Sequence, residues 1–266
     1  MIERWQRFGS LLVRLRFVSA NAAAFTKHTI GDQYVDVAPG TEPDYSLTLE
    51  DGYGENYDEV TPVGYEKNER GDFRVSRADF LVESTADLRE AHIRFYNYFG
   101  LRTALLNWYS RILSRLDWGM LIHSSCIVQD GQAYLFSGYS GAGKSTIASM
   151  SQPRPILADE TTVVEIRKDG RILIHDSPFR NDFKEPYREG PVPLKGIYLI
   201  KQSLNIEQHR MTKSDAMFAL FDKIVHWRHE NADTIGLIRL SKTLVDRVPV
   251  YELEFQKNDR FWEAIS

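Results

Sequence analysis

Cysteine is almost absent from this sequence of 266 residues, which contains Cys126 alone. A single cysteine cannot form a disulfide within the chain, so the framework of a small, disulfide-stabilised secreted domain is excluded. Cys126 lies in an apolar run, and this setting favours a buried structural thiol over a nucleophile. The cysteine content therefore predicts a protein of the reducing cytoplasm.

Long hydrophobic runs are missing as well. No stretch approaches the roughly 18 apolar residues that a membrane-spanning helix needs. Residues 1–7 lack the apolar core and the small-residue cleavage site of a signal peptide. We find no internal repeat and no low-complexity tract. These absences predict a protein without a membrane partner.

A large excess of charge of one sign is also absent. The 33 lysines and arginines are opposed by 37 aspartates and glutamates, which gives a net charge of −4 and argues against a general nucleic-acid-binding protein. With 42% apolar and 26% charged residues, the composition is that of an ordinary globular protein. The chain is long enough to bury a sizeable core in one large domain or two small ones.

The most informative stretch present runs from Gly138 to Thr146 and matches the pattern G-x-x-x-x-G-K-S. In this pattern, glycines let backbone N–H groups curve around nucleotide phosphates, and the N-terminus of the next helix adds its positive end. Lys144 would reach the β- and γ-phosphates, and the Ser145 hydroxyl would coordinate Mg²⁺. A chance match is the alternative, but an apolar strand-like segment precedes the loop and a helix-compatible one follows it. The residues predicted to bind phosphate are Gly138, Tyr139, Ser140, Gly141, Ala142, Gly143, Lys144, Ser145 and Thr146.

Hydrophobic periodicity predicts a small β-rich lobe over residues 10–84, with strands at 11–18, 45–50, 73–75 and 80–82. Residues 86–99 are expected to be helical. A second helix is expected after Gly100, with apolar residues at helical spacing as far as Ile112 and a stop at Gly119. The second helix would join an N-terminal lobe, residues 1–116, to a catalytic domain, residues 117–266.

The second half of the sequence predicts an α/β domain, a mixed sheet with flanking helices. Segments 120–128 and 133–137 should form a hairpin around Asp130-Gly131, and the second of these strands leads into the glycine-rich loop. Helices are expected at 213–230 and 259–265. Further strands are expected at 156–160, 161–166, 171–175, 195–200 and 248–255.

Two adjacent acids, Asp159 and Glu160, lie 15 and 16 residues beyond Lys144. A short helix and a returning strand fill this interval, so the acids should emerge at the same sheet edge as the loop. Phosphoryl transfer needs carboxylates to hold Mg²⁺ and to orient the attacking hydroxyl. Neighbouring strand residues point to opposite faces, so both acids can serve one site only if Glu160 lies beyond the strand end. A solvated acidic turn is the alternative.

His123 lies inside an apolar strand ahead of the loop. A histidine in this setting is ordinarily a hydrogen-bonded core residue. Its strand leads into the hairpin that carries the loop, so a role in the same site is the second interpretation.

From about residue 119 onwards, the sequence resembles the HPr kinase/phosphorylase superfamily. The resemblance is carried by His123, 15 residues before Gly138, by the loop itself, and by Leu157-Ala158-Asp159-Glu160. The ordered segments LRTALLNWYS, GMLIHSS, PLKGIYLI, VPVYELEF and FWEAI extend the resemblance over most of the chain, to the lasso-peptide precursor kinases. Those enzymes phosphorylate the hydroxyl of the precursor peptide's C-terminal serine.

The resemblance implies a P-loop kinase core of the HPr-kinase type, preceded by the smaller β-rich lobe, with ATP and Mg²⁺ as cofactors. It implies that Asp159 accepts or orients the proton of the substrate hydroxyl. It also implies that Glu160 binds Mg²⁺ with Ser145 and that His123 supports Asp159 beside the γ-phosphate. Arg180 and Glu189 are further candidates for the site.

The sequence departs from the superfamily in one place, where residues 190–196 read GPVPLKG and no LEIRGLG segment is found. The reverse, phosphate-dependent dephosphorylation and the hexamer of the superfamily are therefore not implied. The number of subunits is left open, and an oligomer is compatible with the sequence.

Together these features predict a cytoplasmic, ATP- and Mg²⁺-dependent kinase that acts on a serine of a precursor peptide. One alternative is a kinase of the same fold that acts on a protein or a small alcohol. Another, of a different class, is a regulatory module in which ATP binding changes the affinity for a partner with little turnover.

Overall fold

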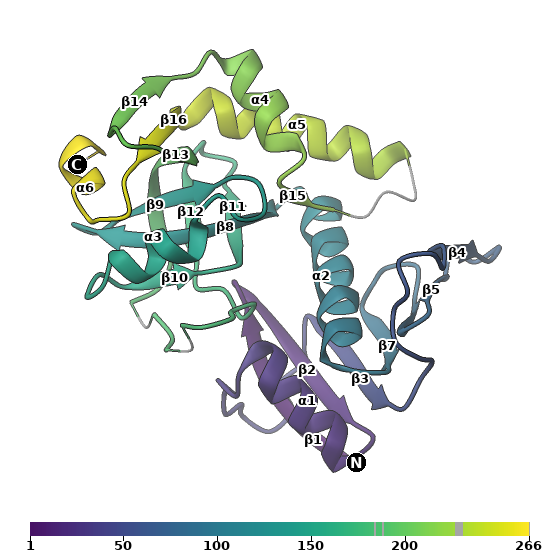
Figure 1. Cartoon of the computed structure of the whole chain (residues 1–266). Helices are drawn as coiled ribbons and strands as arrows, with labels where there is room; N and C mark the ends of the chain where they lie inside the picture. Colours follow the sequence, from purple (N-terminus) through teal and green to yellow (C-terminus); the bar gives the residue numbers. More distant parts are fainter. Residues whose placement is uncertain (184, 188, 227–230, 266) are drawn as a thin grey trace. The chain divides into compact units, whose positions relative to one another are not determined.

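The computed structural model describes residues 1–183, 185–187, 189–226 and 231–265. Its internal contacts divide the chain into two compact units, Met1–Ile112 and Leu113–Ser266; Figure 1 labels their elements. The sequence places this boundary after residue 116. In the part of the chain that the structure describes, no helix combines the length and the apolar character needed to cross a membrane.

The N-terminal unit is built on one seven-stranded sheet. Strand β3 is parallel to β2 and to β7, and the other neighbours are antiparallel. Alternate residues are buried along the strands, as in Val13, Leu15 and Phe17 of β2, so one sheet face forms a core. In spatial order, the strands are β1 (Ile2–Phe8), β2 (Leu11–Phe17), β3 (Tyr45–Asp51), β7 (Glu90–Phe95), β6 (Phe80–Ser84), β5 (Phe73–Arg77) and β4 (Gly64–Lys67).

The prediction of a helix over residues 86–99 is wrong, because Glu90–Phe95 forms strand β7. Ala91, Ile93 and Phe95 are buried alternately, and the strand pairs with β3 on one side and β6 on the other. The alternate burial of residues along this strand, with a paired strand on each side, therefore outweighs the local helical pattern.

Two helices accompany this sheet. Helix α1 (Ala20–Ile30) is the crossover that the parallel pair β2 and β3 requires. The hydroxyl of Ser19 caps it by accepting the Ala22 N–H at 2.9 Å. Helix α2 (Tyr98–Arg115) confirms the helix expected after Gly100. Within the N-terminal unit, the Tyr109 hydroxyl on α2 donates to the carbonyl oxygen of Phe8 at 2.8 Å, so α2 is fixed to β1.

Five strands of the C-terminal unit close into a barrel. The pairs β8–β11, β11–β12, β12–β13, β13–β9 and β9–β8 form a ring in which only β9 and β13 are parallel. Strand β16 (Val250–Phe255) extends the parallel part beside β13, and β14 (Glu207–Arg210) pairs with β16. Two short strands, β10 (Ile156–Ala158) and β15 (Ile224–Val225), pair with β8. The barrel strands are β8 (Gly119–Gln129), β9 (Gln132–Ser137), β11 (Thr161–Ile166), β12 (Ile172–His175) and β13 (Val192–Gln202).

The hairpin of β8 and β9 confirms the turn that the Asp130-Gly131 pair predicts. Both residues have positive φ, 51° for Asp130 and 70° for Gly131, as a two-residue hairpin turn of this hand requires. Helix α3 (Lys144–Met150) follows the glycine-rich loop, and α6 (Phe261–Ile265) ends the chain.

The helix expected at 213–230 is shorter than predicted. Helix α4 (Lys213–Phe221) ends before β15, and residues 227–230 lie outside the described part of the chain. Helix α5 (Asn231–Arg247) was not predicted, although Leu237, Leu240 and Leu244 lie at helical spacing and are buried. The mixed α/β architecture with flanking helices is confirmed.

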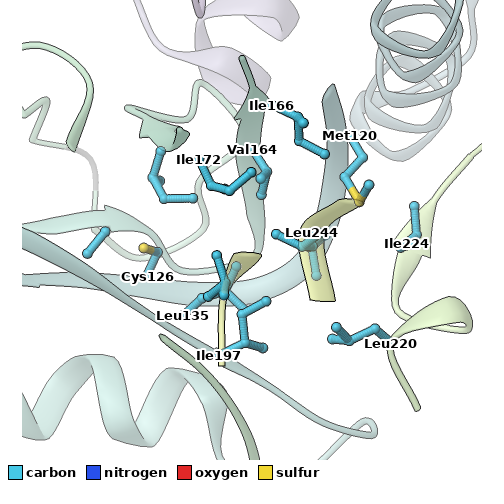
Figure 2. Packing of buried hydrophobic residues seen from close by; sticks show 14 of the residues in the cluster. Met120, Cys126, Leu135, Val164, Ile166, Ile172, Ile197, Leu220, Ile224 and Leu244 are labelled. Carbon is cyan, nitrogen blue, oxygen red and sulfur yellow. The ribbon is translucent and has the colours of Figure 1, made fainter. Parts of the chain in front are cut away.

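Two hydrophobic clusters stabilise the C-terminal unit. One lines a single face of all five barrel strands and includes Leu135, Val164 and Ile197, with Leu220 from α4 and Leu244 from α5 (Figure 2). The other lies on the opposite face of β9, β13 and β16, where α3 and α6 pack. Because residues alternate along β9, Leu135 enters the first cluster while its neighbours Tyr134 and Phe136 enter the second.

Replacing Leu135 with alanine should test the barrel core. Leu135 is fully buried, so its loss removes apolar contacts and leaves a cavity that costs about 2–5 kcal/mol of unfolding free energy. The matched control is Leu204→Ala, because that side chain is 90% exposed. Urea unfolding measures both variants. Equal stability of the two would contradict the packing described above.

Candidate functional site

The glycine-rich loop leaves β9 and enters α3 through a tight curve. Gly141 and Gly143 have φ values of 78° and 110°, where side chains with a Cβ are disfavoured. A Cβ on Gly143 would also lie 2.8 Å from Cζ of Phe255. No side chain caps the N-terminus of α3, so its first N–H groups stay available to a ligand.

Lys144 lies inside this curve and is 8% exposed. Its ammonium group donates to the carbonyl oxygens of Gly138 and Tyr139, both at 3.2 Å. Burial lowers the pKa of Lys144; the carboxylate of Glu160 opposes this shift, and the ammonium group of Lys223 adds to it. Without a ligand, the loop therefore holds its lysine through its own carbonyl groups.

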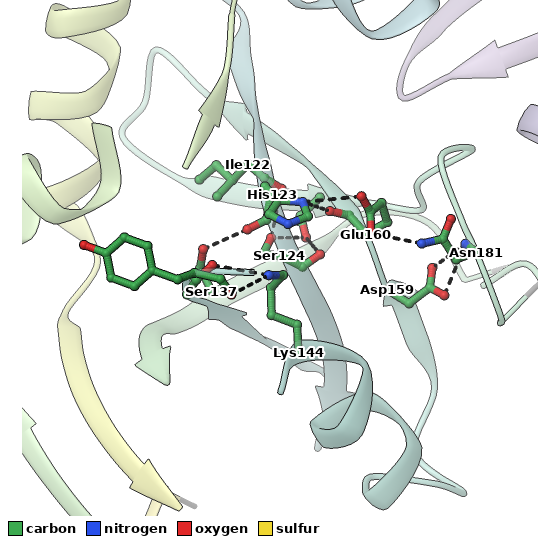
Figure 3. A network of polar contacts seen from close by, with 11 residues as sticks. Ile122, His123, Ser124, Ser137, Lys144, Asp159, Glu160 and Asn181 are labelled. Carbon is green, nitrogen blue, oxygen red and sulfur yellow. Dashed lines mark hydrogen bonds and ion pairs between the residues drawn. The ribbon is translucent and has the colours of Figure 1, made fainter. Parts of the chain in front are cut away.

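His123 and Glu160 meet beside the loop (Figure 3). His123 on β8 lies opposite Thr161 of β11, and its Nδ1 is 3.0 Å from the carbonyl oxygen of Glu160 and 3.6 Å from Oε1 of the same residue. The amide group of Asn181 donates to the other carboxylate oxygen, Oε2, at 2.9 Å. The Glu160 side chain is 29% exposed. It is thus oriented by two partners and still accessible.

Asp159 faces a different group of atoms. The residue is 2% exposed, and its carboxylate accepts the backbone N–H groups of Asn181, Asp182 and Phe183 at distances between 2.7 and 3.3 Å. Glu160, which follows β10, raises the pKa of Lys144 by its charge, whereas Asp159 holds the segment after residue 180. The predicted arrangement, with both carboxylates facing one phosphoryl group, differs from these contacts, and the proton-handling role of Asp159 stays a prediction.

The two further candidates, Arg180 and Glu189, contact other groups and share a cavity. Arg180 is 4% exposed and donates to several backbone carbonyls, among them those of Ile156 and Leu157, while it also pairs with Asp176. Burial raises the pKa of Asp176 to about 6. Glu189 accepts the hydroxyl of Tyr187 at 3.0 Å. Both candidates line a cavity of about 750 Å³ that none of the other predicted site residues borders.

A second cavity, of about 580 Å³, opens at the loop itself. Its walls are loop residues 138–142, the carboxyl ends of β13 and β16, and Lys223. The carboxyl ends of parallel strands are the usual position of ligands in α/β sheets. This cavity is therefore the natural place for a ligand whose phosphates enter the loop.

The oxygen atoms near the loop suit a magnesium ion that arrives with a nucleotide. Among the residues that the structure describes, no group of three His, Cys, Asp or Glu side chains could hold a metal ion alone. Ser145 is exposed and Glu160 is partly exposed, so one hydroxyl and one carboxylate are on offer. Mg²⁺ typically takes one or two protein oxygens and completes its shell with phosphate and water.

Comparison with protein families identifies the family. A family model described as SynChlorMet cassette protein ScmC matches residues 97–266. The chain belongs to the ScmC family. The matched part contains the loop, His123 and both acids, whereas all seven strands of the N-terminal sheet lie outside it. No curated protein matches the sequence.

Two residues of the candidate site were not predicted. Asn181 lies 21 residues beyond Glu160, and no local pattern connects the two positions. Lys223 was assigned only to an amphipathic helix, although it ends up beside the loop in the turn between α4 and β15. Tertiary structure alone brings them to the site.

Replacing Asp159 with asparagine should loosen the segment after residue 180. The amide keeps the shape but puts a donor where N–H groups need an acceptor, and each orphaned N–H costs about 1–3 kcal/mol. We expect faster hydrogen exchange at Asn181, Asp182 and Phe183, measured by mass spectrometry. The control is Glu160→Gln, which retains an acceptor for Asn181. Unchanged exchange in Asp159→Asn would refute the anchoring role.

Proposed function

We propose that this ScmC-family protein is an ATP- and Mg²⁺-dependent kinase that transfers the γ-phosphoryl group to a serine hydroxyl of a peptide. By resemblance to the lasso-peptide precursor kinases, the acceptor is the C-terminal serine of a precursor peptide, and the barrel domain is a P-loop core of the HPr-kinase type. One observation carries the proposal: the glycine-rich loop curves around Lys144 and leads into the uncapped N-terminus of α3, with a cavity of about 580 Å³ beside it.

Phosphoryl transfer depends mainly on positioning and on electrostatic stabilisation. The serine oxygen attacks phosphorus in line, the bond from phosphorus to the β–γ bridging oxygen breaks, and ADP leaves with that oxygen. The hydroxyl proton passes to a carboxylate. Glu160 is the accessible carboxylate, so its contacts favour it for this proton.

In this scheme the other residues hold the reactants. Asp159 is a positioning residue, because its grip on the segment after residue 180 places Asn181 against Glu160. His123 supports the same carboxylate from β8. Bound Mg²⁺ would be held by Ser145 and phosphate oxygens, and it would neutralise charge on the phosphates.

Incubation with γ-labelled ATP and matched peptides tests the proposal. A peptide ending in serine should be labelled, while the same peptide ending in alanine should not. Label on a protein or a small alcohol alone would redirect the assignment to another acceptor. Nucleotide binding without transfer to any acceptor would contradict a kinase.

Two variants separate binding from transfer. Lys144→Ala should weaken ATP binding by about tenfold or more, since a charge-assisted contact to phosphate is lost. Glu160→Gln should bind ATP almost normally and lose about 10²–10⁴ of the transfer rate, because the amide cannot take the proton. Calorimetry and label transfer measure the two effects. Ser149→Ala, on the exposed side of α3, is the control. Full activity of Glu160→Gln would remove the assignment.

A nucleotide-binding regulatory module is the second candidate. The contacts of Asp159 favour it, because both oxygens of that carboxylate already accept backbone N–H groups. The accessible Glu160 favours the kinase. The label-transfer experiment decides between them.

A further inference from the structure

Lys223 is a nearly buried cation pressed against the glycine-rich loop. It lies between α4 and β15 and is 7% exposed. Its ammonium group lies 3.6 Å from the centre of the Tyr139 ring, and Tyr139 is the second residue of the loop. The same group is 2.6 Å from Oδ2 of Asp222. Lysines are seldom buried unless they are paired, so ring and carboxylate together hold this charge at the loop.

The backbone fixes Lys223 to the strand that carries His123. The N–H of His123 donates to the carbonyl oxygen of Lys223 at 2.8 Å, and the N–H of Lys223 donates to that of Leu220 at 2.9 Å. The next residue, Ile224, pairs with Ile122 of β8. Lys223 therefore has a defined place relative to the predicted site, because three elements converge there.

Two ammonium groups thus face the same region. Lys144 donates to the carbonyl oxygen of Tyr139 while Lys223 lies over the ring of the same residue, and Lys223 lines the cavity of about 580 Å³ at the loop. The charge of Lys223 also lowers the pKa of Lys144. Two neighbouring cations repel each other, whereas an anion of several charges placed between them removes the repulsion. The exposed ring of Tyr139, 77% accessible, and the carboxylate of Asp222 hold Lys223 until such an anion arrives.

We infer that Lys223 is a second phosphate-contacting residue, one that binds the terminal phosphoryl group of the nucleotide. This inference rests on the proposed function. During transfer Lys223 forms and breaks no covalent bond. It donates hydrogen bonds to the equatorial oxygens of the transferred phosphoryl group, and its positive charge stabilises the negative charge on those oxygens. Lys144 serves the phosphates from inside the loop, and Lys223 serves them from the turn after α4.

Nucleotide titration of Lys223→Met tests the inference. Methionine keeps the apolar stem without the charge. Calorimetry should show that the affinity of the variant for ATP and for tripolyphosphate falls by about tenfold or more relative to the wild-type protein, while its affinity for ADP falls by less than about threefold. Lys223→Arg should restore most of the preference for ATP. The control is Lys213→Met, because Lys213 is exposed at the start of α4 and pairs with Asp246.

An ATP-to-ADP affinity ratio that stays at the wild-type value in a folded Lys223→Met variant overturns the inference. If thermal melting shows that this variant does not fold, Asp222→Asn decides. This substitution removes the carboxylate that pairs with Lys223, so the freed ammonium group of Lys223 should raise the ATP-to-ADP affinity ratio. An unchanged or lower ratio overturns the inference.

The outcomes also separate this inference from the proposed function. Binding of ATP that depends on Lys223, without label on the serine peptide, supports the inference and counts against the kinase. If the wild-type protein labels the serine peptide and Lys223→Met retains both the full ATP affinity and the full transfer rate, the inference alone is overturned. If the wild-type protein binds none of ATP, ADP and tripolyphosphate, both are overturned.

Discussion

The account depends on the placement of Lys144, a nearly buried cation that the glycine-rich loop holds through the carbonyl oxygens of Gly138 and Tyr139. A nearly buried ammonium group loses hydration, and its pKa falls as a result. The negative charge of Glu160 opposes part of that pKa shift, so the fold sets both Lys144 and Glu160 to work on the same ligand site. A polyphosphate in the loop would offset it more fully, which is why the arrangement suits a ligand with several negative charges.

Much of the C-terminal unit serves to place these two side chains. The parallel strands β9 and β13 set the start of the loop, and the packing of Phe255 against Gly143 sets its end. On the other side, β8 and β11 bring His123 to Glu160. The barrel and its two clusters are thus the rigid support on which a site that needs accurate distances can rest.

Local chemistry made part of this structure predictable. The hairpin follows from the positive φ that Asp130 and Gly131 tolerate, and the loop follows from its glycine spacing with a strand before it. The capture of Asp159 by N–H groups more than 20 residues away leaves no local pattern, so its role could not be read from the sequence. Strand β7 was missed for the same reason, because partners distant in sequence decide its conformation. The matched family model covers the site and begins after the last strand of the N-terminal sheet.

The most direct test is a crystal structure of the protein with Mg²⁺ and a non-hydrolysable ATP analogue. The account predicts that the triphosphate lies in the loop between Gly138 and Ser145. It also predicts that Nζ of Lys144 exchanges the carbonyl oxygens of Gly138 and Tyr139 for phosphate oxygens. An analogue bound elsewhere, or a Lys144 that keeps both carbonyl contacts beside an empty loop, would contradict it.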